Sequence, residues 1–289
     1  MIEQIIFKSN NRWGSSLNRG VEISEQLKSI GYNASYKDPK EMGTKYLPAD
    51  TKNSVIIVLK SMDVPEFQTL YQNGNKLILD VIDCIGNDDY SLEEICRWPY
   101  HGMIFPTEEL ASKAKELRPD LEVAVLPHHW DKRHLENVGK QNSDKLALGY
   151  IGSAGGLFHG ELLKPASIVH DWSEQTRTSP MYNCHYSVRP KGESQYLYKP
   201  NSKASTAAAV GSNIITSRDK ALENLLPEDY PYYTETDIDS VRDAIKYAEE
   251  TYGTAVWEYG LECMKELKHK TSIEFIVENG YVEFINKFC

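Results

Sequence analysis

The chain has 289 residues, of which 40% are hydrophobic and 10% aromatic. This length fits two domains of about 130–150 residues each, and the apolar content excludes a globally disordered chain. The formal net charge of −10 argues against a broadly basic, nucleic-acid-binding surface, although it leaves room for a local basic cleft.

Sequence features also bear on where the protein acts. Apolar runs stay below the ~18 residues that span a bilayer, and the N-terminus lacks a basic region followed by an apolar core. The five cysteines are scattered without a CxxC pair, so reduced thiols are the simplest interpretation and a zinc site is disfavoured. We therefore expect a cytoplasmic protein without a transmembrane segment.

The first half alternates apolar runs with helical patterns. Continuous runs rich in β-branched residues suit buried parallel strands, and they cover residues 1–8, 54–59, 76–83 and 123–126. Helical periodicity covers 21–30, 91–96 and 108–117, the last with Thr107 as its N-cap. This alternation predicts a doubly wound parallel sheet, which binds ligands at the carboxyl ends of its strands.

The same alternation returns after a polar linker, residues 132–144. Strands are expected over 146–151, over 184–188 and from Ile214, with a turn or short strand over 230–233. Helices are expected within 162–172 and over 238–252, 254–270 and 272–288. The prediction is an α/β protein with two Rossmann-like, doubly wound domains that face a cleft. These are residues 1–131 and 145–270, and residues 271–289 form a C-terminal helix that crosses back to the first domain.

The most informative stretch runs KPNSKASTAAAVGSNII from Lys199. Asn201 or Ser202 can cap a helix, the small residues that follow let it pack closely, and Gly211 suits its C-terminal end. Lys203 falls in the first turn, where the helix dipole disfavours a cation unless an anion is bound there. The alternative interpretation is a solvated surface lysine.

This stretch resembles the donor-binding segment of GT-B glycosyltransferases, where Pro-x-x-Lys-x-x-x-Ala-x-Ala-x-Gly opens the helix that faces the nucleotide diphosphate. Three further segments resemble that superfamily in the expected order, and the resemblance covers most of residues 1–260. They are 104–111, 123–131 and 146–153.

The resemblance implies a donor site in the second half. Its expected residues are Gly152, Ser153, Arg189, Tyr198, Ser202, Lys203, Ser205 and Thr206. Gly152 and Ser153 open a small-residue loop whose amides can surround a phosphate, with a simple turn as the alternative. The planar guanidinium of Arg189 suits a diphosphate, and a surface salt bridge is its alternative role.

The sequence also departs from the superfamily. Tyr198 and Thr206 stand where many retaining members carry two glutamates. Many members carry an arginine after the glycine that corresponds to Gly149 and a lysine a few residues later. Here Tyr150 follows Gly149, and the next lysine is Lys164. We therefore expect Arg189 and Lys203 to replace the usual diphosphate-binding pair.

The first half offers an acceptor side and two candidate catalytic residues. The loop after the first strand contains Arg12, Trp13, Gly14 and Arg19, which supply cations, a stacking face and a tight turn. Asp83, near a strand's carboxyl end, is the candidate base, and His129 at the hinge is a candidate for proton transfer or hydrogen bonding. Capping and packing are the alternative roles.

These features predict a glycosyltransferase that moves a sugar from a nucleotide sugar to an acceptor hydroxyl. The arginine, the lysine and the helix N-terminus would stabilise the leaving diphosphate, so no metal or other cofactor is expected. A glycan, lipid-linked or small-molecule acceptor is favoured over a nucleic acid. The alternatives are a nucleotide-sugar binding protein without transfer activity and an epimerase-like enzyme.

Overall fold

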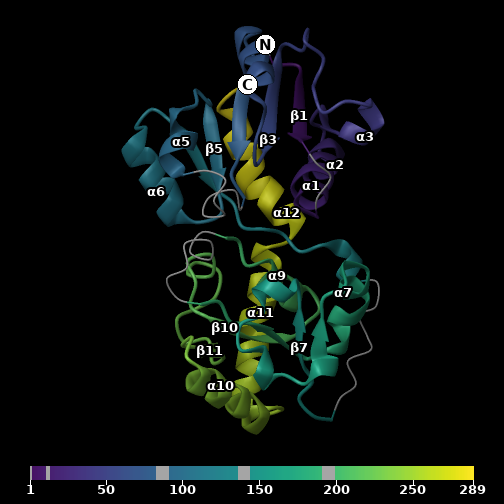
Figure 1. Ribbon diagram of the computed structural model, residues 1–289, viewed down its shortest axis with the longest axis vertical. Coiled ribbons are helices and arrows are strands. Elements are labelled where there is room, and N and C mark those ends of the chain that lie inside the picture. Colours follow the sequence, from purple (N-terminus) through teal and green to yellow (C-terminus); the bar gives the residue numbers. More distant parts are fainter. Residues whose placement is uncertain (1, 11–13, 83–90, 136–143, 191–198) are drawn as a thin grey trace. The chain divides into compact units, whose positions relative to one another are not determined.

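The computed structural model describes residues 2–10, 14–82, 91–135, 144–190 and 199–289 (Figure 1). It divides into two compact units. Unit 1 consists mainly of Met1–His128 and Ile273–Cys289, and unit 2 of His129–Leu197 and Asn201–Ser272. The C-terminal segment thus belongs to the same unit as the N-terminal half.

Within the described residues, unit 1 contains a six-stranded parallel sheet of order β2-β1-β3-β4-β5-β6. Because the chain places β2 on one side of β1 and β3 on the other, the topological switch point lies between β1 and β3. The strands are β1 Gln4–Ser9, β2 Ala34–Lys37, β3 Ser54–Leu59, β4 Lys76–Asp80, β5 Gly102–Phe105 and β6 Glu122–Val125.

Helices connect and cover these strands. Thr107 caps α6 as expected, since its Oγ1 accepts from the Leu110 amide at 3.4 Å. The helical elements are α1 Gly14–Ser16, η1 Leu17–Glu22, α2 Ile23–Ser29, α3 Pro39–Met42, α4 Val64–Gln72, α5 Leu92–Arg97, α6 Glu108–Leu117, α12 Ile273–Ile276, η7 Val277–Tyr281 and α13 Val282–Asn286.

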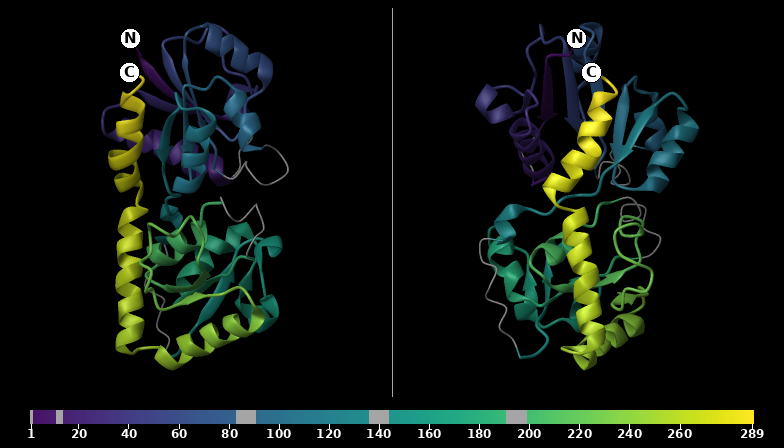
Figure 2. Two further views of the ribbon diagram at one scale, coloured as in Figure 1. Left: turned by 90° about the vertical axis from the view of Figure 1, so that its left-hand side faces the viewer. Right: turned by 180° about the vertical axis from the view of Figure 1, so that it is seen from behind.

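The unit 1 sheet is buried on both faces. One face packs Ile56 and Val58 against Phe67 of α4. The other packs Phe7 against Tyr281 and Phe284 of the C-terminal segment, which lies across the sheet in the right-hand view of Figure 2. Each such fully buried side chain contributes ~1.5–3 kcal/mol, so the C-terminal segment is an integral part of the unit 1 core.

In the described part of unit 2, five parallel strands form a sheet of order β11-β10-β9-β7-β8. β8 lies on one side of β7 and β9 on the other, so the switch point lies between β7 and β9. The strands are β7 Leu148–Ile151, β8 Ile168–Val169, β9 Cys184–Ser187, β10 Asn213–Ser217 and β11 Tyr233–Thr234.

The helix expected within residues 162–172 is wrong for most of that range. Pro165–Ser167 forms a short 3-10 turn (η5), Ile168–Val169 joins the sheet, and α7 begins only at Trp172. Pro165 has no amide hydrogen to continue a helix, and the β-branched pair suits a strand. The helical elements of unit 2 are η2 Lys132–Leu135, η3 Ala154–Gly156, η4 Gly160–Leu162, η5, α7 Trp172–Thr178, η6 Ser179–Met181, α9 Ser202–Ala209, α10 Ile238–Thr251 and α11 Ala255–Lys270.

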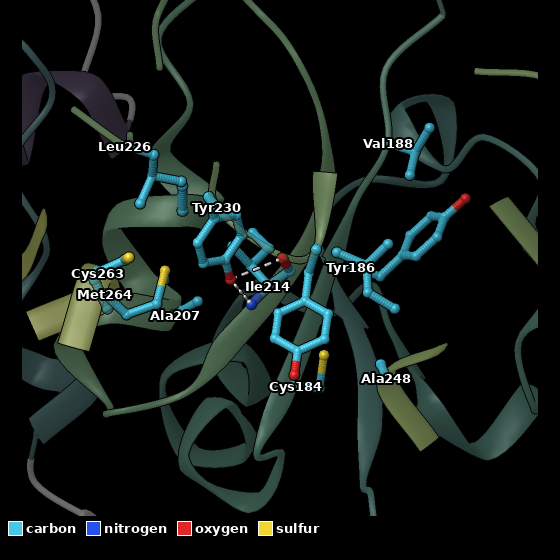
Figure 3. Close-up of a cluster of buried hydrophobic side chains, with 14 of the residues drawn as sticks. Cys184, Tyr186, Val188, Ala207, Ile214, Leu226, Tyr230, Ala248, Cys263 and Met264 are labelled. Atoms are coloured by element: carbon cyan, nitrogen blue, oxygen red, sulfur yellow. Dashed lines mark hydrogen bonds between the residues drawn. The ribbon is translucent and has the colours of Figure 1, made fainter. Parts of the chain in front are cut away.

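The unit 2 core contains a buried tyrosine tied to the sheet backbone. The Tyr230 hydroxyl accepts from the Ile214 amide at 2.9 Å and donates to the Ile214 carbonyl at 3.0 Å (Figure 3). Apolar side chains such as Cys184 and Met264 surround it. Burial raises the pKa of Tyr230 well above its usual value, so the phenol stays protonated and keeps both bonds.

Candidate functional site

The candidate site lies at the carboxyl edge of the unit 2 sheet. Gly152 directly follows β7, and α9 is the next helix after β9 that the structure describes. These are the two strands that flank the switch point of this sheet. Doubly wound sheets bind ligands at this position, because the connections diverge there and leave a crevice.

Helix α9 starts with a side-chain cap. The Asn201 Oδ1 accepts from the Ala204 amide at 3.2 Å, which identifies Asn201 as the N-cap. Ala204 and Ala207 are fully buried, so the helix packs closely on unit 2. The first turn contains Lys203 and no acidic residue, and its dipole therefore favours an anion.

Lys203 lies against the glycine loop that follows β7. A Cβ placed on Gly152 would lie 2.7 Å from Lys203 Cε and 3.2 Å from its Nζ, and Gly152 has a φ of +154°. The Nζ also lies 5.3 Å from the ring centre of Tyr150, within cation–π range. Only glycine at position 152 lets the lysine approach this closely, so the loop and the helix start form one cationic site.

Hydrogen bonds fix the shape of the glycine loop. The Gly152 amide donates to the Val169 carbonyl at 3.0 Å, and the His170 Nδ1 lies 2.7 Å from the Gly152 carbonyl. The Tyr150 hydroxyl donates to the Ser153 carbonyl at 2.7 Å. These bonds hold the loop in place beside Lys203, and the Gly152 amide, which was expected to face a phosphate, is bound to the Val169 carbonyl instead. His170 was not predicted from the sequence, although its place directly after the Ile168–Val169 strand is a signal for a strand-end residue.

Arg189 is engaged in a buried ion pair. Its NH1 lies 3.2 Å from Asp219 Oδ2, and both side chains are 8% exposed. The Asn201 Nδ2 donates to the same Asp219 oxygen at 2.9 Å, so the pair supports the cap of α9. Burial raises the pKa of Asp219, and the nearby Arg189 partly opposes that rise. We expected Arg189 to bind the donor diphosphate, with a surface salt bridge as its alternative role. The salt bridge is present but buried, and through Asp219 and Asn201 it supports the start of α9.

The other predicted donor residues differ in exposure. Ser153 and Ser202 are exposed, Thr206 is half-buried and Ser205 is buried. Ser202, Ser205 and Thr206 follow the three- and four-residue spacing of one helix face. Tyr198 lies outside the described residues. The structure thus brings Gly152, Ser153, Ser202 and Lys203 to the same edge of unit 2.

His129 differs from its expected role. Its side chain is only 1% exposed, and the neighbouring Trp130 donates from Nε1 to the Lys268 carbonyl at 3.0 Å. A side chain so enclosed has no surface on which to exchange a proton with a substrate, which favours the packing interpretation.

Arg19 also differs from its expected role. Its guanidinium is buried and binds both oxygens of Asp80 and the Pro127 carbonyl, so its donors serve the fold of unit 1. Gly14 begins α1. Arg12, Trp13 and Asp83 lie outside the described residues.

The described residues contain neither a cluster of metal ligands nor a helix that could span a membrane. Within these ranges, no three His, Cys, Asp or Glu side chains come close enough together to hold a metal ion. Of the helices that the structure describes, none combines the length and the hydropathy needed to cross a membrane.

The comparisons with known proteins bear on the fold. No family model and no curated protein matches the sequence. Among solved structures, a glycosyltransferase from Rickettsia africae matches with a TM-score of 0.64 and 9% identity, over 99% of this chain and 98% of that one. HepE from Anabaena, in complex with UDP, matches with a TM-score of 0.65 and 8% identity over 98% and 100%. A UDP-forming α,α-trehalose-phosphate synthase from Burkholderia vietnamiensis matches with a TM-score of 0.61 and 10% identity over 99% of both chains. At such low identity the likeness establishes the fold alone, and it confirms the resemblance that the sequence predicted: the chain has the α/β fold of the GT-B glycosyltransferases.

Proposed function

We propose that the protein is a glycosyltransferase that moves a sugar from a nucleotide-sugar donor to an acceptor hydroxyl. The observation that carries this proposal is the position of Lys203. Its ammonium lies in the first turn of α9, against the glycine loop after β7, at the switch point of the unit 2 sheet. A diphosphate held there meets a positive side chain and the positive end of a helix together.

The chemistry follows from where charge develops. When the bond between the anomeric carbon and the diphosphate breaks, negative charge grows on the departing phosphate oxygen. Lys203 and the positive end of α9 would stabilise that charge from positions fixed by the fold, so little reorganisation would be needed. We propose that this arrangement supplies the countercharge without a metal ion.

The structural relatives suggest which donor to test first. HepE was solved with UDP, and the trehalose-phosphate synthase is UDP-forming. We therefore propose a UDP-sugar as donor. The buried Arg189–Asp219 pair would act indirectly, by holding Asn201 and with it the start of α9.

Substitution of Lys203 tests the proposal. Loss of a charge-assisted hydrogen bond corresponds to about 1.5–3 kcal/mol, so Lys203→Ala should bind UDP roughly 10–100-fold more weakly by calorimetry. Lys246→Ala is the matched control, because Lys246 is an exposed lysine of α10 in the same unit. Wild-type affinity in Lys203→Ala would remove this site from the proposal. If the wild type does not bind UDP, the other nucleoside diphosphates are tested in the same way.

A nucleotide-sugar binding protein without transfer activity is the second candidate. Thr206, half-buried on α9, stands at a position where the resembling enzymes often carry a glutamate, and a threonine cannot supply that carboxylate. Donor hydrolysis and transfer, measured beside UDP binding, separate the two. Tight binding with no turnover towards any acceptor in a sugar and glycan panel would favour the binding protein.

A further inference from the structure

One edge of the unit 1 sheet is open. β6 is the last strand of that sheet and pairs with β5. The Leu126 amide donates to the Phe105 carbonyl at 2.9 Å, which fixes the side towards which each residue of β6 points its polar groups. These groups alternate between the two sides of a strand, so the amides and carbonyls of Val123 and Val125 point away from β5. In the ranges that the structure describes, neither valine makes a hydrogen bond on that side.

Such an edge can pair with a further strand. Two amides and two carbonyls without partners can bind an extended segment of another chain, the recognition mode known as β-strand addition. Proteins often protect an edge with a lysine or a proline within the strand. β6 contains neither, and its one charged side chain, Glu122, is bound to Lys287 at 3.1 Å. Because β6 has only four residues, side-chain contacts must add to the backbone pairing.

A groove beside this edge can supply those contacts. It has a volume of about 540 Å³ and lies between one flank of α6 and the side chains of Val123 and Val125. Its apolar lining is completed by Ala111 of α6. Figure 1 shows α6 on the outer flank of unit 1. A strand added to β6 would lie about 4.8 Å beyond it, with alternate side chains on the face that contains this groove.

The unpaired charges around the groove are carboxylates. Glu108 and Glu116 line it, are exposed and make no ion pair with any described residue. Lys115, the cation of the lining, donates to two backbone carbonyls of the turn after α6, both at 2.9 Å. Glu116 lies in the last turn of α6, where the helix dipole opposes an acidic group. A cation supplied by a partner would remove that conflict.

The residues outside the described ranges do not reverse this charge. Those of unit 1 include one arginine and three aspartates, so their sum is negative. Residues 136–143 and 191–198 each contain one glutamate and one lysine. The charge balance of unit 1 therefore favours a basic partner over an acidic one.

The two carboxylates also define a spacing. Glu108 and Glu116 are eight positions apart, which corresponds to about 12 Å along an α-helix. In an extended segment, residues i and i+4 are about 13 Å apart and point to the same face, as does residue i+2 between them. Two cations at i and i+4 therefore match the two carboxylates, and a small apolar residue at i+2 matches the apolar lining.

We propose that the open edge of β6 binds an extended segment of another protein with Lys or Arg at positions i and i+4 and a small apolar residue at i+2. Its backbone pairs with Val123 and Val125, and its cations contact Glu108 and Glu116. A second copy of this chain does not fit, because like-charged rims would face each other. Its Arg-x-Ala-x-Lys sequence, residues 242–246, also lies inside α10 and not in a strand.

An NMR titration of the full chain with the end-capped peptide SKTVTKS tests the site. The Val123 and Val125 amide signals should shift, and exchange of these protons with solvent should slow several-fold at saturation, because both gain a hydrogen bond. The peptide SKKVTTS has the same composition, but its adjacent lysines point to opposite faces. The peptide SETVTES has glutamates in place of the lysines. Both should bind more weakly, and SETVTES roughly tenfold or more.

The double variant Glu108→Lys/Glu116→Lys reverses the charge of the rim. It should bind SKTVTKS roughly tenfold or more weakly and should now prefer SETVTES. A lysine in place of Glu116 suits the last turn of α6, so weaker binding would not reflect a weakened helix. Glu25→Lys/Glu41→Lys is the matched control: both glutamates are exposed, on α2 and α3 of the same unit, and the total charge change is equal. This variant should bind like the wild type.

Binding of SKTVTKS that depends on the rim carboxylates and slows exchange of the two valine amides supports the proposal. It is overturned if SKTVTKS does not bind, if all three peptides bind equally, or if the two amides are unchanged at saturation. Equal loss of affinity in the control variant overturns it too, since net charge alone would then explain binding. A dimer in sedimentation whose two valine amides exchange slowly without peptide would place a second copy on the edge instead.

Discussion

Arg19 and Asp80 form a bidentate ion pair inside unit 1. The Arg19 Nε lies 2.9 Å from Asp80 Oδ2, and its NH2 lies 3.1 Å from Oδ1. The Tyr281 hydroxyl donates to the same Oδ2 at 3.0 Å, and the Arg19 NH1 donates to the Pro127 carbonyl at 2.9 Å. The ion pair thereby joins η1, β4 and the C-terminal segment through Asp80, and Pro127 through Arg19.

Asp80→Asn should destabilise unit 1 strongly. The substitution leaves the Arg19 charge buried without its carboxylate, a loss of about 3–5 kcal/mol in the free energy of unfolding. Urea unfolding measures the change. The double variant Arg19→Met/Asp80→Asn should lose less than the sum of the single variants, because it also removes the unpaired charge. Strict additivity would show that the two residues do not interact.

The Arg19–Asp80 pair also shows which contacts could not be predicted from the sequence. Arg19 was expected to bind an anion, and it does, but the anion is a carboxylate that lies 61 positions away in the chain. Tyr281, the third member, is 201 positions from Asp80. Local patterns identify residue types that suit anions or strand ends, whereas the choice of partner depends on how the sheet and the C-terminal segment pack.

Gly152→Ala should impair donor binding and also lower the folding stability by roughly 1 kcal/mol, because a φ of +154° is strained for alanine. The added Cβ would lie 2.7 Å from Lys203 Cε, so the lysine must move away from the loop. We expect UDP affinity to fall roughly tenfold, as for loss of a charged hydrogen bond. Gly155→Ala is the control, because a Cβ there meets no atom within 4 Å, and it should bind UDP like the wild type. Equal affinities in the two variants would contradict the contact.

The elements that the sequence predicted well carry strong local signals. The buried strand Ser54–Leu59 has the expected bounds, and Thr107, Asn201 and Gly211 take their expected places at helix ends. In contrast, the edge strand Ala34–Lys37 was not predicted, because its sequence ASYK offers no apolar run. Such edge strands form through pairing with a neighbour, which the sequence alone does not specify.

Asn201→Ala should affect both stability and binding. It removes the cap of α9 and the hydrogen bond to Asp219, with a loss of about 1–2 kcal/mol in the free energy of unfolding. Because the start of α9 then frays, UDP binding should weaken as well. Thr107→Ala removes a comparable cap from α6 in unit 1 and should cost similar stability while UDP affinity stays unchanged. A Thr107→Ala variant that binds as weakly as Asn201→Ala would show a general effect of stability.

Two buried histidines of unit 2 should make its stability depend on pH. The His185 Nε2 donates to the Ser179 carbonyl at 3.1 Å, and the His134 Nδ1 lies 2.7 Å from the Ser179 hydroxyl. Burial lowers the pKa of His185 from 6.5 to about 4 and also lowers the pKa of His134. Both rings are therefore neutral in the folded protein at neutral pH. The unfolded chain binds more protons than the folded one between about pH 6.5 and 4, so the free energy of unfolding falls as the pH is lowered through that range.

His185→Gln measures this contribution. Glutamine keeps an amide donor for the Ser179 carbonyl but binds no proton, so the variant should lose less stability between pH 7 and pH 4.5. The difference approaches roughly 3 kcal/mol at the acid end, at 1.36 kcal/mol per pKa unit. Urea unfolding of the wild type and the variant at pH 7, 5.5 and 4.5 gives the slope of the free energy of unfolding against pH for each protein. The nearby Asp131 does not obscure them, because Arg133 holds the pKa of this carboxyl below 3.8 against the effect of burial, and its contribution is lost only at lower pH. Identical slopes in the two proteins would mean that His185 is not the group that loses stability in acid.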